Sequence, residues 1–267
     1  VAALLGIPIS AEQERAVQAP LKPCAVIAGA GTGKTTVMAA RVVWLVASRL
    51  VSPEEILGLT FTNKATAELS ERIESNLTRV GLLTSEQPRP TVATYDSFAG
   101  TLVNDYGAWD GINTGAHLIT AARAYQLAAE VIMGLNKAPL AATHMGPTFI
   151  AQAVVKLAGA MASHDASPGK VRRADARWRQ MLLAAPTKRG GDRYADIDKW
   201  LSRVDEREEL LDLVAAYQNL KKERGLVEFG DRMVQALHLV THHPRVGEEL
   251  RARYRVVLLD EYQDTSS

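Results

Sequence analysis

The stretch that decides the fold is Ala28-Gly29-Ala30-Gly31-Thr32-Gly33-Lys34-Thr35-Thr36, a glycine-rich segment between an apolar run and a helical pattern. Glycines allow a backbone to wrap around phosphate oxygens and to point several N–H groups inward. Gly33 permits close approach, Lys34 is expected to neutralise the β- and γ-phosphates, and Thr35 is expected to offer its hydroxyl to Mg²⁺. All nine residues are therefore predicted to bind a nucleotide.

A second motif closes the sequence: the apolar run Val256-Val257-Leu258-Leu259 leads directly into Asp260-Glu261-Tyr262-Gln263-Asp264. In a parallel α/β sheet, ligands gather at the carboxyl ends of the strands. Asp260 is expected to hold Mg²⁺, and Glu261 to act as the base that orients and deprotonates the attacking water. An Asp-Glu pair favours ATP hydrolysis over phosphoryl transfer to another substrate, so ATP and Mg²⁺ are the expected cofactors.

The order of the patterns predicts an α/β fold with a parallel sheet, because strands alternate with helices. Strands are predicted at 24–28, 56–61, 91–94 and 256–259, and helices at 10–18, 34–48 and 64–80. Between about 120 and 225 the chain is rich in Ala, Leu and Arg at helical spacing. We expect a motor domain over 1–105, a helical insertion over 106–225, and the motor domain resumed over 226–267. The chain is also expected to be a piece of a longer protein, truncated after the acidic motif.

Composition narrows the class of protein. Hydrophobic residues make up 47% and charged residues 23%, with a net charge of +1, which is typical of a soluble globular protein. No apolar run approaches the roughly 20 residues of a membrane span, so no membrane association is expected. Cys24 is the single cysteine, and its apolar neighbours predict a buried thiol in a reducing, cytoplasmic compartment.

The two motifs together resemble those of the UvrD/Rep/PcrA group, the superfamily 1A DNA helicases. Four further segments follow in the order of that family. They are Ala11-Glu12-Gln13-Glu14-Arg15, Leu59-Thr60-Phe61-Thr62-Asn63-Lys64-Ala65, Thr94-Tyr95-Asp96-Ser97-Phe98 and Glu228-Phe229-Gly230-Asp231. The family usually has His where this chain has Asp96, so Asp96 is expected to cap the following helix rather than to contact DNA.

The resemblance implies roles for particular residues. Gln13 would read the adenine edge and Arg41 would stack on the adenine, while Lys34, Asp260, Glu261 and Gln263 would form the catalytic set. The residues implied to contact DNA are Phe61, Thr62, Asn63, Thr94 and Ser97. Phe61 would supply a ring for base stacking, and the hydroxyl and amide groups would bind phosphates or sugars.

The resemblance also implies a RecA-like P-loop NTPase domain with an inserted helical domain. Its activity would be ATP-driven translocation along single-stranded DNA, usually 3′ to 5′, in DNA repair or recombination. Single-stranded DNA and single-strand/duplex junctions are the expected partners, with nuclease or repair subunits as candidates. We expect this chain by itself to bind Mg·ATP but to hydrolyse it poorly and not to unwind DNA. The alternative is a motor-like subunit of a helicase–nuclease complex that binds DNA and ATP without turnover of its own.

The insertion contains a basic run that has two interpretations. Its members are Lys170, Arg172, Arg173, Arg177, Arg179, Lys188, Arg189 and Arg193. In the family this insertion faces duplex DNA, and a basic patch there would bind phosphates without reading sequence. A charged run is also typical of a solvated helix face. Within the same segment, one apolar helical stripe is predicted from Trp200, Leu201, Val204, Leu211, Val214 and Tyr217.

Overall fold

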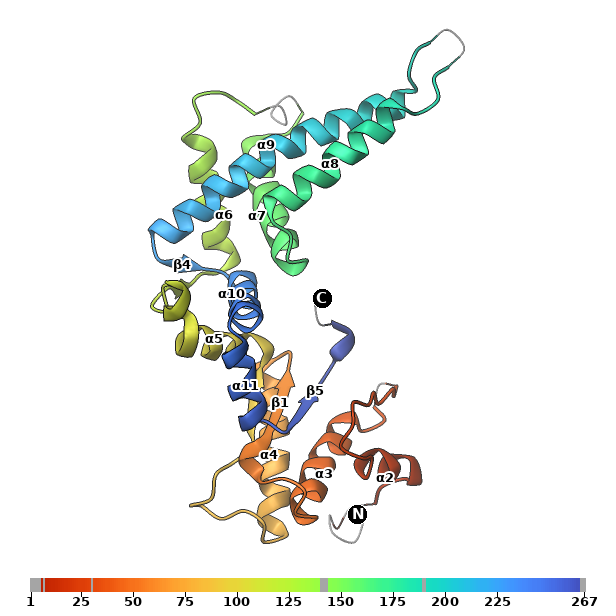
Figure 1. Ribbon diagram of the computed structural model, residues 1–267, viewed down its shortest axis with the longest axis vertical. Coiled ribbons are helices and arrows are strands. Elements are labelled where there is room, and N and C mark those ends of the chain that lie inside the picture. The colour runs from red at the N-terminus through yellow and green to blue at the C-terminus, as the bar shows by residue number, and fades with distance from the viewer. Residues whose placement is uncertain (1–5, 7, 30, 140–143, 189–190, 265–267) are drawn as a thin grey trace. The chain divides into compact units, whose positions relative to one another are not determined.

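The computed structural model describes residues 6, 8–29, 31–139, 144–188 and 191–264. Two compact units are present. The first combines the described residues up to Leu102 with those from His238 onward, and the second extends from Val103 to Leu237. Figure 1 labels the elements of both units. Within the described residues, no helix combines the length and the apolar character needed to cross a membrane.

The first unit contains a parallel sheet of three strands in the order β2-β1-β5. These strands are β1 (Ile56–Thr60), β2 (Thr91–Thr94) and β5 (Val256–Leu259). All five residues of β1 are buried, as expected for a central strand of a parallel sheet that is covered on both faces. Thr60 pairs with Thr94, and Leu59 with Leu259, so the carboxyl ends of the strands meet at one edge. The predicted α/β fold with a parallel sheet is confirmed.

Helices surround this sheet. The first unit contains α2 (Ala11–Val17), α3 (Lys34–Ala47), α4 (Asn63–Arg79), α11 (Pro244–Arg253) and the 3₁₀ turns Pro53–Glu55 and Tyr262–Asp264. Two helices span the limits of the units, namely α5 (Tyr95–Tyr106) and α10 (Phe229–His242). Apolar side chains of α3 and α4 pack with β1 and β5 into one core, and Figure 1 shows these two helices beside the sheet. Burying this apolar surface is the main force that holds α3 and α4 against the sheet.

The predicted strand at 24–28 is wrong. Residues 23–29 have no regular secondary structure, and Ile27 is 97% exposed. A strand needs a neighbour to bond its N–H and C=O groups, and β5 is bonded only to β1 within the described sheet. Cys24 is likewise exposed, so the predicted buried thiol is also wrong.

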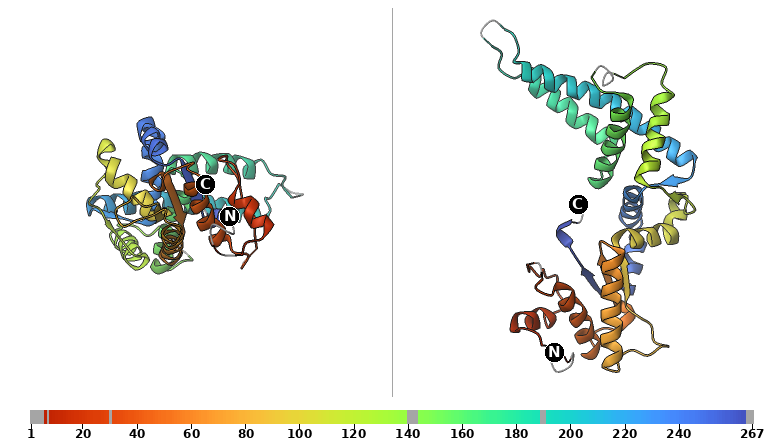
Figure 2. Two further views of the ribbon diagram at one scale, coloured as in Figure 1. Left: turned by 90° about the horizontal axis from the view of Figure 1, so that it is seen from below. Right: turned by 180° about the vertical axis from the view of Figure 1, so that it is seen from behind.

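The second unit is mainly helical. It contains α6 (Ala121–Met133), α7 (Pro147–Ser163), α8 (Pro168–Leu183), α9 (Ala195–Glu223) and the 3₁₀ turn Gly107–Asp110. Two short parallel strands, β3 (His117–Leu118) and β4 (Leu226–Val227), join its ends. Its core is formed by α6, α7 and α9, while α8 and α9 lie side by side in Figures 1 and 2. The predicted stripe on α9 is buried from Leu201 to Tyr217, but Trp200 is half-exposed and packs against Trp178 with ring centroids 5.4 Å apart.

One buried charged cluster fixes the connection between α9 and α10. The ammonium of Lys221, 2% exposed, lies 2.5 Å from Glu228 Oε2 and 2.6 Å from Asp231 Oδ2. The Tyr217 hydroxyl donates to the same Glu228 oxygen at 2.7 Å, and the Glu228 N–H donates to Asp231 at 2.9 Å. Burial first, and then the bond to Glu228, raise the pKa of Tyr217 well above its usual range. The Glu228-Phe229-Gly230-Asp231 segment is therefore anchored by a desolvated cation.

Candidate nucleotide and DNA site

The glycine-rich loop leads directly into α3, which begins at Lys34. Gly31 and Gly33 have φ values of 75° and 84°, the left-handed region in which a side chain is strained. This turn leaves the first N–H groups of α3 without helical partners and facing the loop, which makes a site for an anion. The left-handed glycines are those expected of a phosphate-binding loop, and binding of a phosphate here stays a prediction; Ala30 lies outside the described residues.

Gln13 braces this loop from α2. Ser10 caps α2, and the amide oxygen of Gln13 accepts the Ser10 N–H at 2.9 Å to complete a capping box. The other end of the same amide, Nε2, donates to the carbonyl of Thr32 at 3.0 Å. A Cβ at Gly33 would lie 3.2 Å from this Nε2, so Gly33 also makes room for the brace. In this structure Gln13 thus contacts the loop itself.

The loop closes on its own polar groups. The Lys34 ammonium donates to the carbonyl of Ala28 at 3.3 Å, and the Thr32 hydroxyl donates to the carbonyl of Gly29 at 2.8 Å. The ammonium group of Lys34 therefore lies against the glycine-rich loop that precedes α3. Thr36, in the first turn of α3, accepts a hydrogen bond from Arg72 of α4 at 3.2 Å.

Arg41, for which the resemblance implies stacking on the adenine, is bonded to the backbone around the end of α2. It is 8% exposed, and its guanidinium donates to carbonyls at the end of α2 and in the following turn. The acceptors are Ala16, Val17, Ala19 and Pro20, at 3.4, 2.9, 2.8 and 3.3 Å. These bonds satisfy carbonyls at the end of α2 and bury the guanidinium, which gives Arg41 a structural role, and its stacking on the adenine stays a prediction.

The acidic motif lies where β5 ends. The Asp260 N–H donates to Leu59 O at 2.9 Å, which extends the sheet by one residue. Asp260 Oδ1 accepts the N–H of Glu261 at 3.1 Å, and Gln263 donates its amide N–H to the Glu261 carboxylate. Glu261 has φ 48°, a left-handed conformation that costs a non-glycine residue on the order of 1 kcal/mol or more. The motif is thus a tight turn that presents two adjacent carboxylates.

The electrostatics of this turn favour a bound cation. Burial raises the pKa of Asp260, the charge of Glu261 raises it further, and the Glu261 N–H and the charge of Lys34 act in the opposite direction. A divalent cation would stabilise both carboxylates, and Asp260 and the Thr35 hydroxyl are hard oxygen donors of the kind that Mg²⁺ prefers. The residues present therefore fit Mg²⁺.

The residues expected to contact DNA differ in how they are presented. Phe61 is 42% exposed at the end of β1, and Thr62, Asn63 and Ser97 are exposed too. Thr62 caps α4 by accepting from the Ala65 N–H at 3.1 Å. Thr94 is buried and accepts from the Ser97 N–H at 3.0 Å.

The expectation that Asp96 caps α5 is wrong. Thr94, rather than Asp96, caps α5. Asp96 lies in the first turn of α5, where its negative charge interacts favourably with the positive end of the helix dipole. Thr94 therefore has a structural role as the cap of α5. Phe61, in contrast, presents an exposed aromatic ring at the end of β1.

Two residues near the site did not stand out in the sequence. Tyr95 contacts Phe61, with ring centroids 4.9 Å apart, and donates its hydroxyl to the Asp260 carbonyl at 3.1 Å. Burial and the nearby Asp260 raise the pKa of Tyr95 to about 12, so the hydroxyl stays protonated at neutral pH. Arg72, nine residues into α4, reaches Thr36 as described above. Tyr95 belongs to the segment Thr94-Tyr95-Asp96-Ser97-Phe98, but its contact with Asp260 follows only from the pairing of the strands.

Several residues of the insertion's basic run form ion pairs with neighbouring carboxylates. Arg172 contacts Glu208 and Asp212 of α9 at 2.6 Å each, and Arg179 pairs with Asp205. Lys170 pairs with Asp165 at 3.5 Å, Arg193 with Asp198 at 3.6 Å, and Lys188 lies 5.6 Å from the ring centroid of Tyr194. Arg189 lies outside the described residues. Arg172 and Arg179 therefore support the α8–α9 pairing, and Lys170 and Arg193 form local ion pairs, which weakens the interpretation of this run as a phosphate-binding patch.

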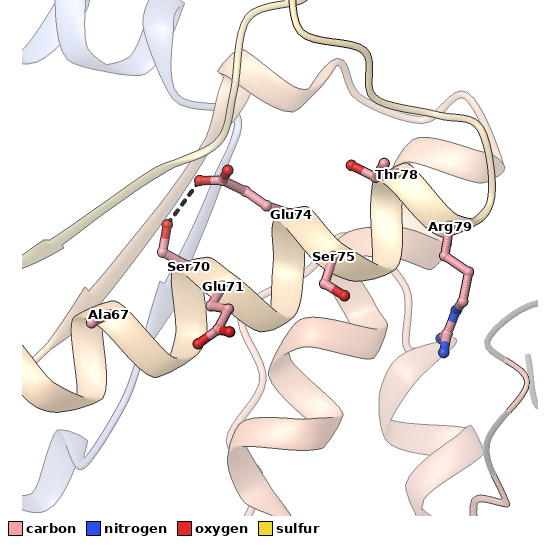
Figure 3. A pocket seen from close by; sticks show the side chains of 7 residues that line it. All are labelled: Ala67, Ser70, Glu71, Glu74, Ser75, Thr78 and Arg79. Carbon is pink, nitrogen blue, oxygen red and sulfur yellow. Dashed lines mark hydrogen bonds between the residues drawn. The ribbon is translucent and has the colours of Figure 1, made fainter.

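A shallow recess on the surface of α4 belongs to a single helix (Figure 3). It is lined by Ala67, Ser70, Glu71, Glu74, Ser75, Thr78 and Arg79. Ser70 donates to Glu74 at 3.1 Å, and Arg89 pairs with Glu74 at 2.7 Å, so its polar groups bond locally. We assign no ligand to this recess.

Comparison with known proteins identifies relatives along almost the whole chain. The family model described as UvrD/REP helicase N-terminal domain matches residues 9–267. DNA helicase II of Rickettsia typhi is 27% identical over 97% of this chain and 33% of its own length. ATP-dependent DNA helicase UvrD1 of Mycobacterium tuberculosis is 26% identical over 97% of this chain and 29% of its own length. DNA helicase II of Escherichia coli is 26% identical over 96% and 30%. The chain thus spans about a third of the length of these relatives.

Proposed function

This chain belongs to the UvrD/REP helicase N-terminal domain family, and from that premise we propose that it is the ATP-binding part of a DNA helicase. The helicase would hydrolyse Mg·ATP to move along single-stranded DNA, 3′ to 5′, in DNA repair or recombination. One observation carries the proposal: a left-handed glycine turn leads into α3, and in the same compact unit the Asp260–Glu261 turn lies at the carboxyl end of β5, the edge of a parallel sheet where ligands bind.

The residues would divide the chemistry among them. The N–H groups of the loop and the Lys34 ammonium would bind the β- and γ-phosphates. Thr35 and Asp260 would hold Mg²⁺, which when bound neutralises charge on the phosphate oxygens. Glu261 would orient the attacking water and accept its proton, with Gln263 holding the Glu261 carboxylate.

DNA would bind at the carboxyl edge of β1 and β2. The exposed ring of Phe61 would stack on a base, and Thr62, Asn63 and Ser97 would contact phosphates or sugars. Stacking and phosphate contacts accept any sequence, as translocation requires. Gln13 and Thr36 would border the nucleotide.

The test is equilibrium binding of a fluorescent ATP analogue with Mg²⁺ to the full-length gene product, with and without a single-stranded oligonucleotide. Lys34→Ala should weaken binding at least tenfold, while Lys156→Ala, on the exposed surface of α7, should leave it unchanged. Equal affinity of wild type and Lys34→Ala would refute the nucleotide site.

Turnover separates a motor from a subunit that only binds. Glu261→Gln should abolish ATP hydrolysis and strand separation while retaining analogue binding, because only the base is removed. Displacement of a block from one end of a single strand, and not from the other, would report the direction. Binding without hydrolysis in the wild type would favour a non-hydrolysing subunit instead.

A further inference from the structure

Three segments meet at the carboxyl edge of the sheet, and one side chain contacts the other two. Phe61 follows β1, Tyr95 follows β2, and Asp260 follows β5. The Tyr95 ring packs on Phe61 at 4.9 Å between centroids with an interplanar angle of 52°. Its hydroxyl donates to the Asp260 carbonyl at 3.1 Å. Tyr95 thus connects an exposed ring with the backbone of the acidic turn.

The backbone of the acidic turn is fixed by hydrogen bonds around the carbonyl that Tyr95 contacts. The Asp260 N–H donates a hydrogen bond to Leu59 O, and the Glu261 N–H donates one to Asp260 Oδ1. Glu261 has a left-handed φ of 48° and is therefore held by its surroundings rather than by its own preference. The bond from Tyr95 reaches the carbonyl between these two residues. A displacement of that carbonyl would rotate the peptide unit that leads into Glu261 and would redirect the Glu261 carboxylate.

We propose that Tyr95 is a positioning residue that couples a base stacked on Phe61 to the Asp260–Glu261 turn. A base that shifts the Phe61 ring displaces the Tyr95 ring packed against it, because close-packed rings move together. The Tyr95 hydroxyl passes that displacement to the acidic turn. This inference rests on the proposed function, since it needs both DNA and nucleotide as ligands.

Coupling between two ligands is reciprocal, which makes the proposal measurable without hydrolysis. If DNA changes the affinity for nucleotide by some factor, nucleotide changes the affinity for DNA by the same factor. Tyr95→Phe retains the ring and removes only the hydroxyl. The expected result is a loss of about threefold to tenfold in the coupling factor, the range that one hydrogen bond supplies.

The experiment uses the full-length gene product, a fluorescent ATP analogue with Mg²⁺, and an oligothymidylate. Tyr95→Phe should bind each ligand alone within about twofold of wild type, with an unchanged thermal midpoint, and its coupling factor should be lower than that of wild type by about threefold to tenfold. Tyr254→Phe is the matched control, because that hydroxyl lies 3.4 Å from Thr91 Oγ1 at the amino end of β2. Tyr254→Phe should retain the coupling factor of wild type.

A second variant approaches the same link from the other side. Phe61→Leu leaves the Tyr95 hydroxyl in place but removes the ring, so it should weaken DNA binding and abolish the coupling. The double variant should then show no further loss of coupling beyond Phe61→Leu.

The outcomes separate this inference from the proposed function. Unchanged coupling in Tyr95→Phe, or in Phe61→Leu where Tyr95→Phe does not fold, overturns the role of Tyr95. So does an absence of coupling in the wild type, or an equal loss of nucleotide affinity without DNA. Failure of the wild type to bind nucleotide better than Lys34→Ala overturns the proposed function itself.

Discussion

The side-chain amide of Gln13 joins two structures: its oxygen accepts the Ser10 N–H at 2.9 Å and its nitrogen donates to the Thr32 carbonyl at 3.0 Å. The first bond completes the cap of α2, and the second fixes the phosphate-binding loop. One residue therefore ties the start of a helix to a loop nineteen residues later.

Gln13→Glu should separate these two functions. The carboxylate can still accept the Ser10 N–H, but it cannot donate to Thr32, and it adds a negative charge near the phosphates. We expect nucleotide affinity to fall about tenfold, which corresponds to about 1.4 kcal/mol. Ser10→Ala is the control, because it removes a capping acceptor and leaves the bond to Thr32. Equal loss in both variants would show that only the helix cap matters.

The order of strands and helices could be predicted from the sequence because it depends on local signals. The apolar runs at β1, β2 and β5 and the capped start of α2 were predicted to within a residue or so of their limits. The segment 24–28 has the same apolar character, yet whether it forms a strand depends on a neighbour that its own sequence does not specify.

Candidate site residues could be proposed from the sequence where glycines or adjacent carboxylates require a particular backbone conformation. Arg41 and Arg172 could not be assigned in that way, because a guanidinium binds carbonyls, carboxylates and phosphates alike. Which of these it meets is decided by packing. The bond from Tyr95 to Asp260 likewise depends on sheet register, which joins residues far apart in the sequence.

Lys221→Met should destabilise the helical unit. The variant leaves Glu228 and Asp231, both mostly buried, without the cation that lies within 2.6 Å of each. Removing one partner of a buried ion pair costs about 3–5 kcal/mol, and partial exposure of the two acids places the expectation at the lower end. Urea denaturation followed by circular dichroism measures the change in the free energy of unfolding. Lys222→Met, at the exposed next position of α9, should change it by less than about 0.5 kcal/mol.

Asp260→Asn should stabilise the fold at neutral pH while it removes Mg²⁺-dependent nucleotide binding. The folded-state pKa of Asp260 is raised above the ordinary 3.8, mainly by burial, so the ionised carboxylate disfavours folding. That penalty is absent below about pH 3.8 and grows as pH rises through the folded-state pKa. The thermal midpoint of Asp260→Asn should therefore exceed that of wild type at pH 7, and the difference should shrink toward pH 4. Asp105→Asn, on an exposed part of α5, serves as the control. A lower midpoint for Asp260→Asn at pH 7 would contradict the sign.

Arg72→Ala should weaken nucleotide binding through Thr36. The Arg72 guanidinium donates to the Thr36 hydroxyl at 3.2 Å, and Thr36 directly follows the residue expected to hold Mg²⁺. Because the bond is exposed, we expect a loss of about twofold to fivefold in affinity for the ATP analogue, equivalent to about 0.5–1 kcal/mol. Thr36→Val removes the acceptor and should cause the same loss, with no further loss in the double variant. Arg79→Ala removes a guanidinium that bonds Asn76 of the same helix at 2.9 Å, and it should leave affinity unchanged. If Arg72→Ala weakens binding while Thr36→Val does not, Arg72 acts on the nucleotide directly rather than by fixing the first turn of α3.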